Sequence, residues 1–188
     1  MGALKLGDVN YTYEDYRLWE GDWELIGGVP LAMSPAPVRR HQALASEIIR
    51  QLANQLEECP LCEVLGEIDY KVSENTLLRP DIALTCGEIH EAHLIKAPEI
   101  VVEIISPATA KRDEVYKFDI YEAEKVRYYA IIYPDDLRAK VYKLEGSRYD
   151  KQGDFTTESY HFEKTTCGVH LDFKKLFARF RRPEGNGA

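Results

Sequence analysis

The stretch Ile100-Val101-Val102-Glu103-Ile104-Ile105-Ser106 places one glutamate inside an otherwise apolar run of strand-forming residues. The alternation of a strand puts Val101, Glu103 and Ile105 on the same face of a sheet. A carboxylate in a buried strand costs free energy unless a cation or hydrogen-bond donors meet it. The stretch therefore predicts a buried strand that carries a functional acid.

A second acid stands at the start of another apolar run, where Arg79-Pro80-Asp81 precedes Ile82-Ala83-Leu84. If the two runs are neighbouring strands, Asp81 and Glu103 approach each other, and one pKa rises unless a cation intervenes. Oxygen ligands of this kind suit magnesium or manganese better than zinc. The alternative is a pair of strand-end acids that bind Arg79, Lys71 or backbone donors instead.

A helical pattern follows between residues 107 and 125, and Asp113, Lys117 and Tyr121 recur in it at intervals of four residues. Such spacing lines one helix face. A right-handed strand–helix–strand crossover from Ile100 to Tyr133 lays this helix back over the sheet, which brings Lys117 within reach of Glu103. The alternative for Asp113 and Lys117 is a solvated ion pair on the helix surface.

The remaining elements follow from apolar periodicity and from turn residues. The clearest is an amphipathic helix from Val38 to about Glu58, with leucine or isoleucine at every fourth position. A short helix is expected at 13–20, between Thr12 and Gly21, and a final helix at 171–182, capped by Asp172. The helical pattern at 107–125 has Ser106 or Thr109 as its N-cap candidate and Pro107 in its first turn. The other expected elements are a hairpin of 23–26 and 29–33, a break at 34–37, and strands at 62–65, 68–72, 81–85, 127–133, 137–144, 148–151 and 156–162.

This order predicts an α/β fold in which helices flank one mixed central β-sheet, with additional antiparallel strands. A chain of 188 residues is expected to form a single domain over 1–188, with a core at about 13–177 and a disordered tail at about 183–188. Hydrophobic residues make up 45% and charged residues 30%, as in soluble globular proteins. No membrane span or secretory signal is recognisable, so a cytoplasmic protein is expected.

The formal net charge of −8 is unlike that of a protein with an extensive phosphate-binding surface. Short basic clusters occur at 39–40, 111–112 and 179–182, and the last of these also fits a helix C-terminus that complements its own dipole. Cys59-Pro60-Leu61-Cys62 has the spacing of half a zinc site or a redox pair, but no second such motif follows. The four cysteines are therefore interpreted as reduced, near a helix–strand turn.

Three segments together resemble the PD-(D/E)XK restriction-endonuclease-like superfamily: RPDIAL at 79–84, APEIVVEIISPAT at 97–109, and RDEVYKFDIYEAEKVRYYAIIYP at 112–134. More narrowly they resemble its Uma-two family, whose function is largely unassigned. The stretch WELIGGVPLAMSPAPVRRHQALASEI at 23–48 resembles that family's N-terminal hairpin and helix. The resemblance covers about residues 13–177 and implies a restriction-endonuclease-like core.

The resemblance also implies roles for particular residues. Asp81 would be a metal ligand, Glu103 the acid of the (D/E)XK element, and the Ile104 carbonyl a further ligand. Ile105 stands where the superfamily pattern has its lysine, and a lysine moved to the following helix, Lys117, would replace it. The accessory candidates are His41, Glu47, Asp113, Tyr121 and Ser106. Two of them have alternative interpretations: Glu47 as an exposed charge on the helix, and His41 as a capping or packing residue.

The function expected from these residues is magnesium- or manganese-dependent hydrolysis of phosphodiester bonds in nucleic acid, DNA or RNA, by an endonuclease acting as a homodimer. One alternative is a catalytically inactive binding or accessory module with the same fold, which the acidic net charge and Ile105 would favour. Another is a structural homo-oligomer whose tyrosine-rich strands at 127–133 and 137–144 form the interface.

Overall fold

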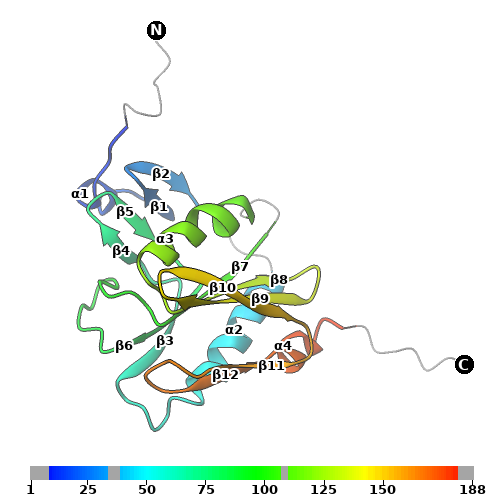
Figure 1. Cartoon of the computed structure of the whole chain (residues 1–188). Helices are drawn as coiled ribbons and strands as arrows, with labels where there is room; N and C mark the ends of the chain where they lie inside the picture. Colours follow the sequence, from blue (N-terminus) through cyan, green and yellow to red (C-terminus); the bar gives the residue numbers. More distant parts are fainter. Residues whose placement is uncertain (1–8, 34–38, 107–109, 182–188) are drawn as a thin grey trace, which may run out of the picture.

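The computed structural model describes residues 9–33, 39–106 and 110–181. Its centre is a six-stranded sheet in the order β10-β9-β8-β7-β6-β3 (Figure 1). The pair β7–β8 is parallel, and the other neighbouring pairs are antiparallel. The bounds of these strands are β3 Cys62–Gly66, β6 Ile82–Cys86, β7 Ile100–Ile104, β8 Tyr128–Tyr133, β9 Arg138–Glu145 and β10 Arg148–Phe155.

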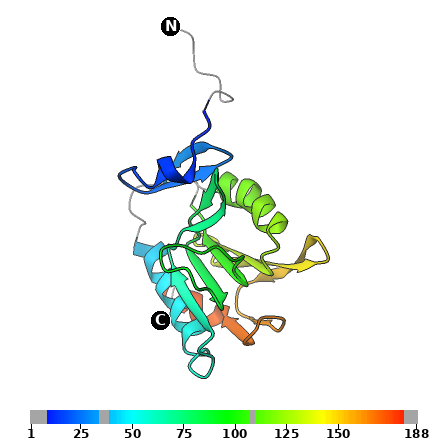
Figure 2. The ribbon, with the colours of Figure 1, turned by 90° about the vertical axis from the view of Figure 1, so that its left-hand side faces the viewer.

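Helices cover both faces of this sheet, as the sequence predicts (Figures 1 and 2). The chain between β7 and β8 forms the π-helical turn η2 (Arg112–Lys117) and then α3 (Phe118–Ala123), so the predicted crossover is confirmed. The opposite face carries α2 (Arg39–Ala53), whose Leu44, Ile48 and Leu52 are fully buried. Apolar side chains therefore line both faces of β7, which explains its nearly unbroken hydrophobic sequence.

Helix α2 ends at Ala53 rather than near Glu58. Beyond it the backbone N–H of Gln55 donates to the Leu52 carbonyl (3.0 Å), and that of Leu56 donates to the Ala53 carbonyl (3.0 Å). These are i to i−3 bonds, so the chain tightens into turns that still direct Leu56 into the core. The apolar period continues past the helix end because the turns keep the same face buried.

The additional antiparallel strands expected from the sequence form two smaller sheets beside the central one. A four-stranded sheet has the order β2-β1-β5-β4, with β1 Trp23–Ile26, β2 Val29–Ala32, β4 Tyr70–Ser73 and β5 Thr76–Leu78. The β1–β2 hairpin is as predicted, whereas the three-residue β5 is too short to give a sequence pattern. The pairing of Leu25 with Leu77 joins this hairpin to the middle of the chain.

The third sheet pairs β11 (Ser159–Phe162) with β12 (Val169–Asp172) and leads into α4 (Phe173–Ala178). Asp172 caps α4 as predicted, since its carboxylate accepts from the Lys175 N–H (3.0 Å). The predicted start at Leu171 is wrong, because Leu171 and Asp172 belong to β12. The predicted strand at 148–151 extends to Phe155, and the one at 156–162 begins only at Ser159.

The first helix, α1 (Tyr13–Tyr16), is shorter than the predicted 13–20. Thr12 does stand at its N-terminus, where its N–H donates to the Asp15 carboxylate (2.8 Å). The chain continues as turns, with the Leu18 N–H donating to the Asp15 carbonyl (3.1 Å). The break at 34–37, the first-turn residue Pro107, the cap candidate Thr109 and the tail at 183–188 lie outside the described residues.

Two further interpretations need correction. The cysteines lie at the expected helix–strand turn but are joined as Cys59–Cys167 and Cys62–Cys86, because the fold brings Cys86 and Cys167 to that turn. Tyr128 and Tyr129 of β8 cannot contribute to an exposed interface, since β8 is an interior strand and they are 1% and 0% exposed. No helix in the described part of the chain is both long and apolar enough to cross a membrane.

Candidate functional site

Asp81 and Glu103 meet at one end of the antiparallel pair β6–β7. Ile82 lies opposite Val102, so one step further along the register places Asp81 opposite Glu103. Directly opposite residues on neighbouring strands project from the same face. The Asp81 N–H donates to Glu103 Oε2 (3.4 Å), and the Ile104 N–H donates to Asp81 Oδ2 (2.7 Å). The two acids are neighbours, as the sequence predicts.

The basic residues named as alternative partners bind elsewhere. The Arg79 guanidinium pairs with Asp69 and with Asp22, at 2.7 Å in each case. Lys71 pairs with the Glu74 carboxylate at 2.6 Å. The same alternative also named backbone donors, and the Ile104 N–H is such a donor to Asp81. The interpretation of Asp81 and Glu103 as strand-end acids neutralised by Arg79 or Lys71 is therefore wrong.

Lys117 reaches the acids from the overlying π-helical turn. Its ammonium group lies 2.9 Å from Glu103 Oε1 and 3.6 Å from Asp113 Oδ1. Lys117 is 1% exposed and Asp113 is 3% exposed, so the alternative of a solvated surface pair is wrong. A π-helical turn holds more residues than an α-helical one. Asp113 and Lys117, four residues apart, therefore both face the sheet. Such turns are frequent at functional sites.

Glu24 completes the surroundings of Lys117, and sequence reasoning missed it. It is 0% exposed in β1, and its Oε1 lies 2.7 Å from the Lys117 ammonium and accepts from the Arg79 N–H (2.9 Å). Its Oε2 lies 3.3 Å from the Arg112 guanidinium. The available signal was the one used for Glu103: an acid between Trp23 and Leu25 in a short hydrophobic strand.

Two tyrosines support the site from within the core. The Tyr121 hydroxyl donates to Glu103 Oε1 (3.0 Å), which confirms that Tyr121 lies on the same helix face as Lys117. The Tyr129 hydroxyl donates to the Asp113 carbonyl (2.9 Å) and so ties η2 to β8. Burial raises the pKa of Tyr121 well above its ordinary value, and the Glu103 charge raises it further. Tyr121 is therefore a neutral hydrogen-bond donor.

The site holds more negative than positive formal charge. Its carboxylates are Glu24, Asp81, Glu103 and Asp113, and its permanent cations are Lys117 and Arg112. When all four carboxylates are ionised, four negative charges against two positive ones leave an excess of two. Burial raises the pKa of Glu103 well above its ordinary value, and the charges of Asp81 and Asp113 add to this while Lys117 opposes it.

Lys117 itself remains charged despite its burial. Burial lowers the pKa of the ammonium group, but the charges of Glu103, Glu24 and Asp113 raise it above its ordinary value. The ammonium therefore stays protonated at neutral pH. The donor set fits a divalent cation, because Mg²⁺ and Mn²⁺ prefer oxygen ligands and proteins commonly bind them through one or two carboxylates.

His41 stands where the site meets solvent. Its Nε2 lies 3.1 Å from Asp81 Oδ2, and the side chains of both residues are 15% exposed. The first turn of α2 thus contacts the start of β6, as expected for a histidine that approaches the site. Burial lowers the pKa of His41, but the hydrogen bond and charge of Asp81 outweigh this and raise it above its ordinary value.

This raised pKa predicts how His41→Gln alters stability in metal-free buffer. Protonated His41 stabilises the folded state below the unfolded pKa of about 6.5, and this contribution is lost as pH rises through the raised folded pKa. We therefore expect the wild-type advantage in unfolding free energy over His41→Gln to be larger at about pH 5.5 than at about pH 8.5. His161→Gln, at an exposed position of β11, is the control in urea titrations. A wild-type advantage over His41→Gln that grew with pH would contradict the assignment.

Two accessory candidates make contacts elsewhere. Glu47 accepts from Arg50 (2.6 and 3.0 Å) and from the Gln51 amide (2.9 Å), so it behaves as a helix surface charge. The Ser106 carbonyl accepts from the Ala110 N–H (2.9 Å) where the chain leaves β7. Ile104 contributes its N–H to Asp81, as described above.

Comparisons with known proteins agree with this architecture. A crystal structure of "a putative nuclease belonging to DUF820" from Anabaena variabilis ATCC 29413 superposes with a TM-score of 0.71 at 17% identity, covering 89% of this chain and 97% of that one. At this identity the likeness concerns the fold. No curated protein matches the chain. The Uma2 family model, described as "Putative restriction endonuclease", matches residues 13–171, and the chain therefore belongs to that family.

Proposed function

We propose that the protein is a magnesium- or manganese-dependent endonuclease that hydrolyses phosphodiester bonds in nucleic acid. The observation that carries the proposal is the convergence of Asp81, Glu103 and Lys117, which come from two strands and the crossover helix. Ile105 occupies the position of the expected lysine, but the Lys117 ammonium lies 2.9 Å from Glu103. The positive charge missing from the strand is supplied from the helix above it.

Asp81 and Glu103 are the residues that would hold the metal. A divalent ion at this position would lower the pKa of a bound water and offset negative charge on a phosphoryl group. The chain itself orients these ligands: the Ile104 N–H and His41 bind Asp81, while Lys117 and Tyr121 bind Glu103. Hydrogen-bonded partners of this kind fix the direction in which a carboxylate presents its free oxygen.

Lys117 and His41 have different positions and so different proposed roles. Lys117 is enclosed by carboxylates and supplies a fixed positive charge that stabilises negative charge developing on the phosphate. His41 is partly exposed beside Asp81, so it is placed to bind or release a proton at the entrance. The absence of a lysine at Ile105 therefore does not argue against catalysis.

A basic cavity supports nucleic acid as the substrate despite the acidic net charge. It has a volume of about 740 Å³ and is lined in part by Arg39, Arg50, Lys175 and Arg179, on α2 and at α4. Arg39 precedes His41 by two residues, so the cavity extends along α2 from the helix end that contacts Asp81. Phosphate oxygens of a strand entering the site would find cationic partners here. We propose DNA as the substrate.

The direct test is hydrolysis of supercoiled plasmid, linear duplex, single-stranded DNA and RNA by the purified protein. We expect cleavage with Mg²⁺ or Mn²⁺ and none with EDTA, because the chain supplies ligands but no Lewis acid. Cleavage that persists unchanged in EDTA after extensive chelation would refute metal dependence. Cleavage of RNA alone would refute the choice of DNA.

The inactive-module alternative keeps the fold and predicts a different outcome. Calorimetric titration would then show that Mg²⁺ and Mn²⁺ fail to bind wild-type protein at the acids, and no substrate would be cleaved. Homodimer formation, which would double the surface available to hold a polyanion, stays a prediction that size-exclusion chromatography with light scattering tests.

A further inference from the structure

All four cysteines of the chain gather at one place, at the far end of the central sheet from the acids. Cys59 lies in the turn after α2, Cys62 begins β3, Cys86 ends β6, and Cys167 lies in the turn between β11 and β12. The bonded pair Cys59–Cys167 spans 108 residues of sequence. Asp81 precedes β6 and Cys86 ends it, so about 17 Å of strand separates the two sites, at about 3.3 Å per residue.

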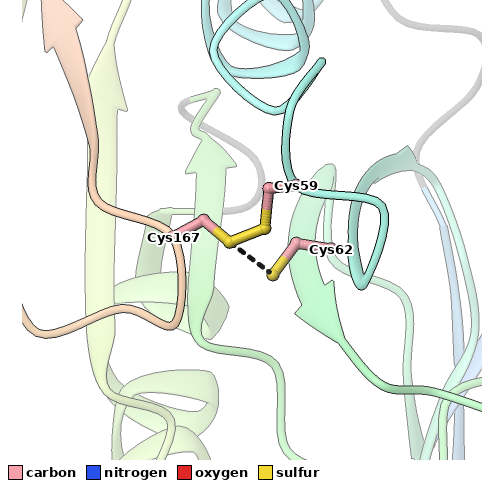
Figure 3. A group of neighbouring side chains, drawn as sticks. All are labelled: Cys59, Cys62 and Cys167. Carbon is pink, nitrogen blue, oxygen red and sulfur yellow. Dashed lines mark hydrogen bonds between the residues drawn. A yellow bond between two sulfur atoms is a disulfide. The ribbon is translucent and has the colours of Figure 1, made fainter.

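The sulfur atoms form one cluster rather than two separate pairs. Cys62 Sγ lies 3.6 Å from Cys167 Sγ, which belongs to the other bonded pair (Figure 3). The sulfurs of Cys59, Cys62 and Cys167 all lie within 4.8 Å of one another, and Cys86 is bonded to Cys62. Tetrahedral zinc with Zn–S bonds of about 2.3 Å holds its sulfurs about 3.8 Å apart. Three of the sulfurs therefore lie close enough together to bind one zinc ion, and the fourth, that of Cys86, lies next to Cys62.

Backbone contacts position these residues independently of the sulfur chemistry. The Cys62 N–H donates to the Cys59 carbonyl (3.1 Å), which closes the Cys59-Pro60-Leu61-Cys62 turn and holds both cysteines together. Cys62 and Cys86 are direct partners on antiparallel β3 and β6, with Cα atoms 4.0 Å apart. Two residues between paired cysteines is the common spacing in structural zinc sites.

We propose that in the reduced protein the thiolates of Cys59, Cys62, Cys86 and Cys167 bind one structural Zn²⁺ ion. Four protein sulfurs complete the tetrahedral shell, so the site has no open position for substrate. Each thiol releases its proton when it binds the ion. The two disulfides are the oxidised form of the same sulfurs, and this form cannot bind zinc because a disulfide offers no thiolate. The ion fastens the α2–β3 turn and the β11–β12 turn to the edge strand β3.

The position of the cluster supports a structural role. Cys62 is 7% exposed, the other three cysteines are partly buried, and all four pack against the apolar core between α2 and the central sheet. Cys167 is held in its turn by the Thr165 hydroxyl, which donates to the Cys167 carbonyl (3.0 Å). Metal binding here would contribute folding free energy directly, because the unfolded chain does not hold the four thiols together.

The test is metal analysis of the full chain purified under reductant from zinc-supplemented cells. We expect one zinc per chain, four thiols that react only after denaturation with a chelator, and the visible absorption of tetrahedral thiolate cobalt when Co²⁺ replaces zinc. Cys59→Ser and Cys167→Ser should each lose the zinc and the cobalt absorption, and should melt at a lower temperature than wild type.

Asp81→Asn is the matched control, because it alters the acidic site and should keep the full zinc content. Chelation that removes zinc should lower the melting temperature of wild type but not that of Cys59→Ser. The proposal is overturned if the reduced, folded chain takes up no zinc or cobalt, or if both serine variants retain full zinc content. If the variants fail to fold, protection of the four wild-type thiols from alkylation by added zinc decides the question. None of these readouts depends on nuclease activity.

Discussion

Asp81→Asn is expected to lower metal-dependent cleavage by about 10²- to 10³-fold while leaving the fold intact. The substitution keeps the side-chain shape and an oxygen that can accept from the Ile104 N–H, but it removes one of the two charges that would hold the ion. Loss of several kcal/mol of metal-derived stabilisation corresponds to roughly a hundred- to a thousandfold in rate, at about 1.4 kcal/mol per tenfold. Initial rates on plasmid DNA with Mg²⁺ or Mn²⁺ measure the effect.

The control for this variant is Asp119→Asn, which neutralises an exposed carboxylate on α3. It should cleave at the wild-type rate. Asp81→Asn should also lose calorimetric binding of Mn²⁺ and melt within a few degrees of wild type in EDTA, because one fewer carboxylate shares the site. An Asp81→Asn protein that unfolds in EDTA yet cleaves normally would refute the assignment of Asp81 as a metal ligand.

Lys117→Met is expected to lower the free energy of unfolding by about 3–5 kcal/mol and to abolish cleavage. Methionine matches the length and apolar stem of lysine but leaves Glu24, Glu103 and Asp113 without their shared cation. Breaking a buried ion pair from one side is costly because the remaining charges stay buried and uncompensated. Urea titration at neutral pH measures the loss.

Lys174→Met, at an exposed position of α4, is the control and should change the free energy of unfolding by less than about 0.5 kcal/mol. The double variant Glu24→Gln/Lys117→Met should recover part of the lost stability, since it removes one of the three carboxylates that lose the Lys117 ammonium. It should still fail to cleave, because the catalytic cation is absent. Recovery of cleavage in that double variant, or wild-type stability in Lys117→Met alone, would show that Lys117 does not have the role proposed here.

The central part of the fold follows from the sequence because its signals are local. Apolar periodicity predicts α2, and the alternation along β7 predicts the face that carries Glu103. The helical pattern between β7 and β8 predicts a crossover helix that joins two parallel strands. Element ends were less well predicted. Helix α2 ends five residues earlier than expected because turns continued its apolar period, and β5 is too short for any period.

The sequence alone was enough to predict that Asp81 and Glu103 meet if their strands are neighbours, since adjacent antiparallel strands bring opposite residues together and a buried carboxylate needs a partner. The residues that surround the two acids depend on tertiary packing. Glu24 comes from a separate small sheet, and a π-helical turn directs Lys117 inward. The four cysteines also come together through tertiary packing. Contacts between distant segments depend on how sheets and helices pack, and residue spacing along the chain does not predict that packing.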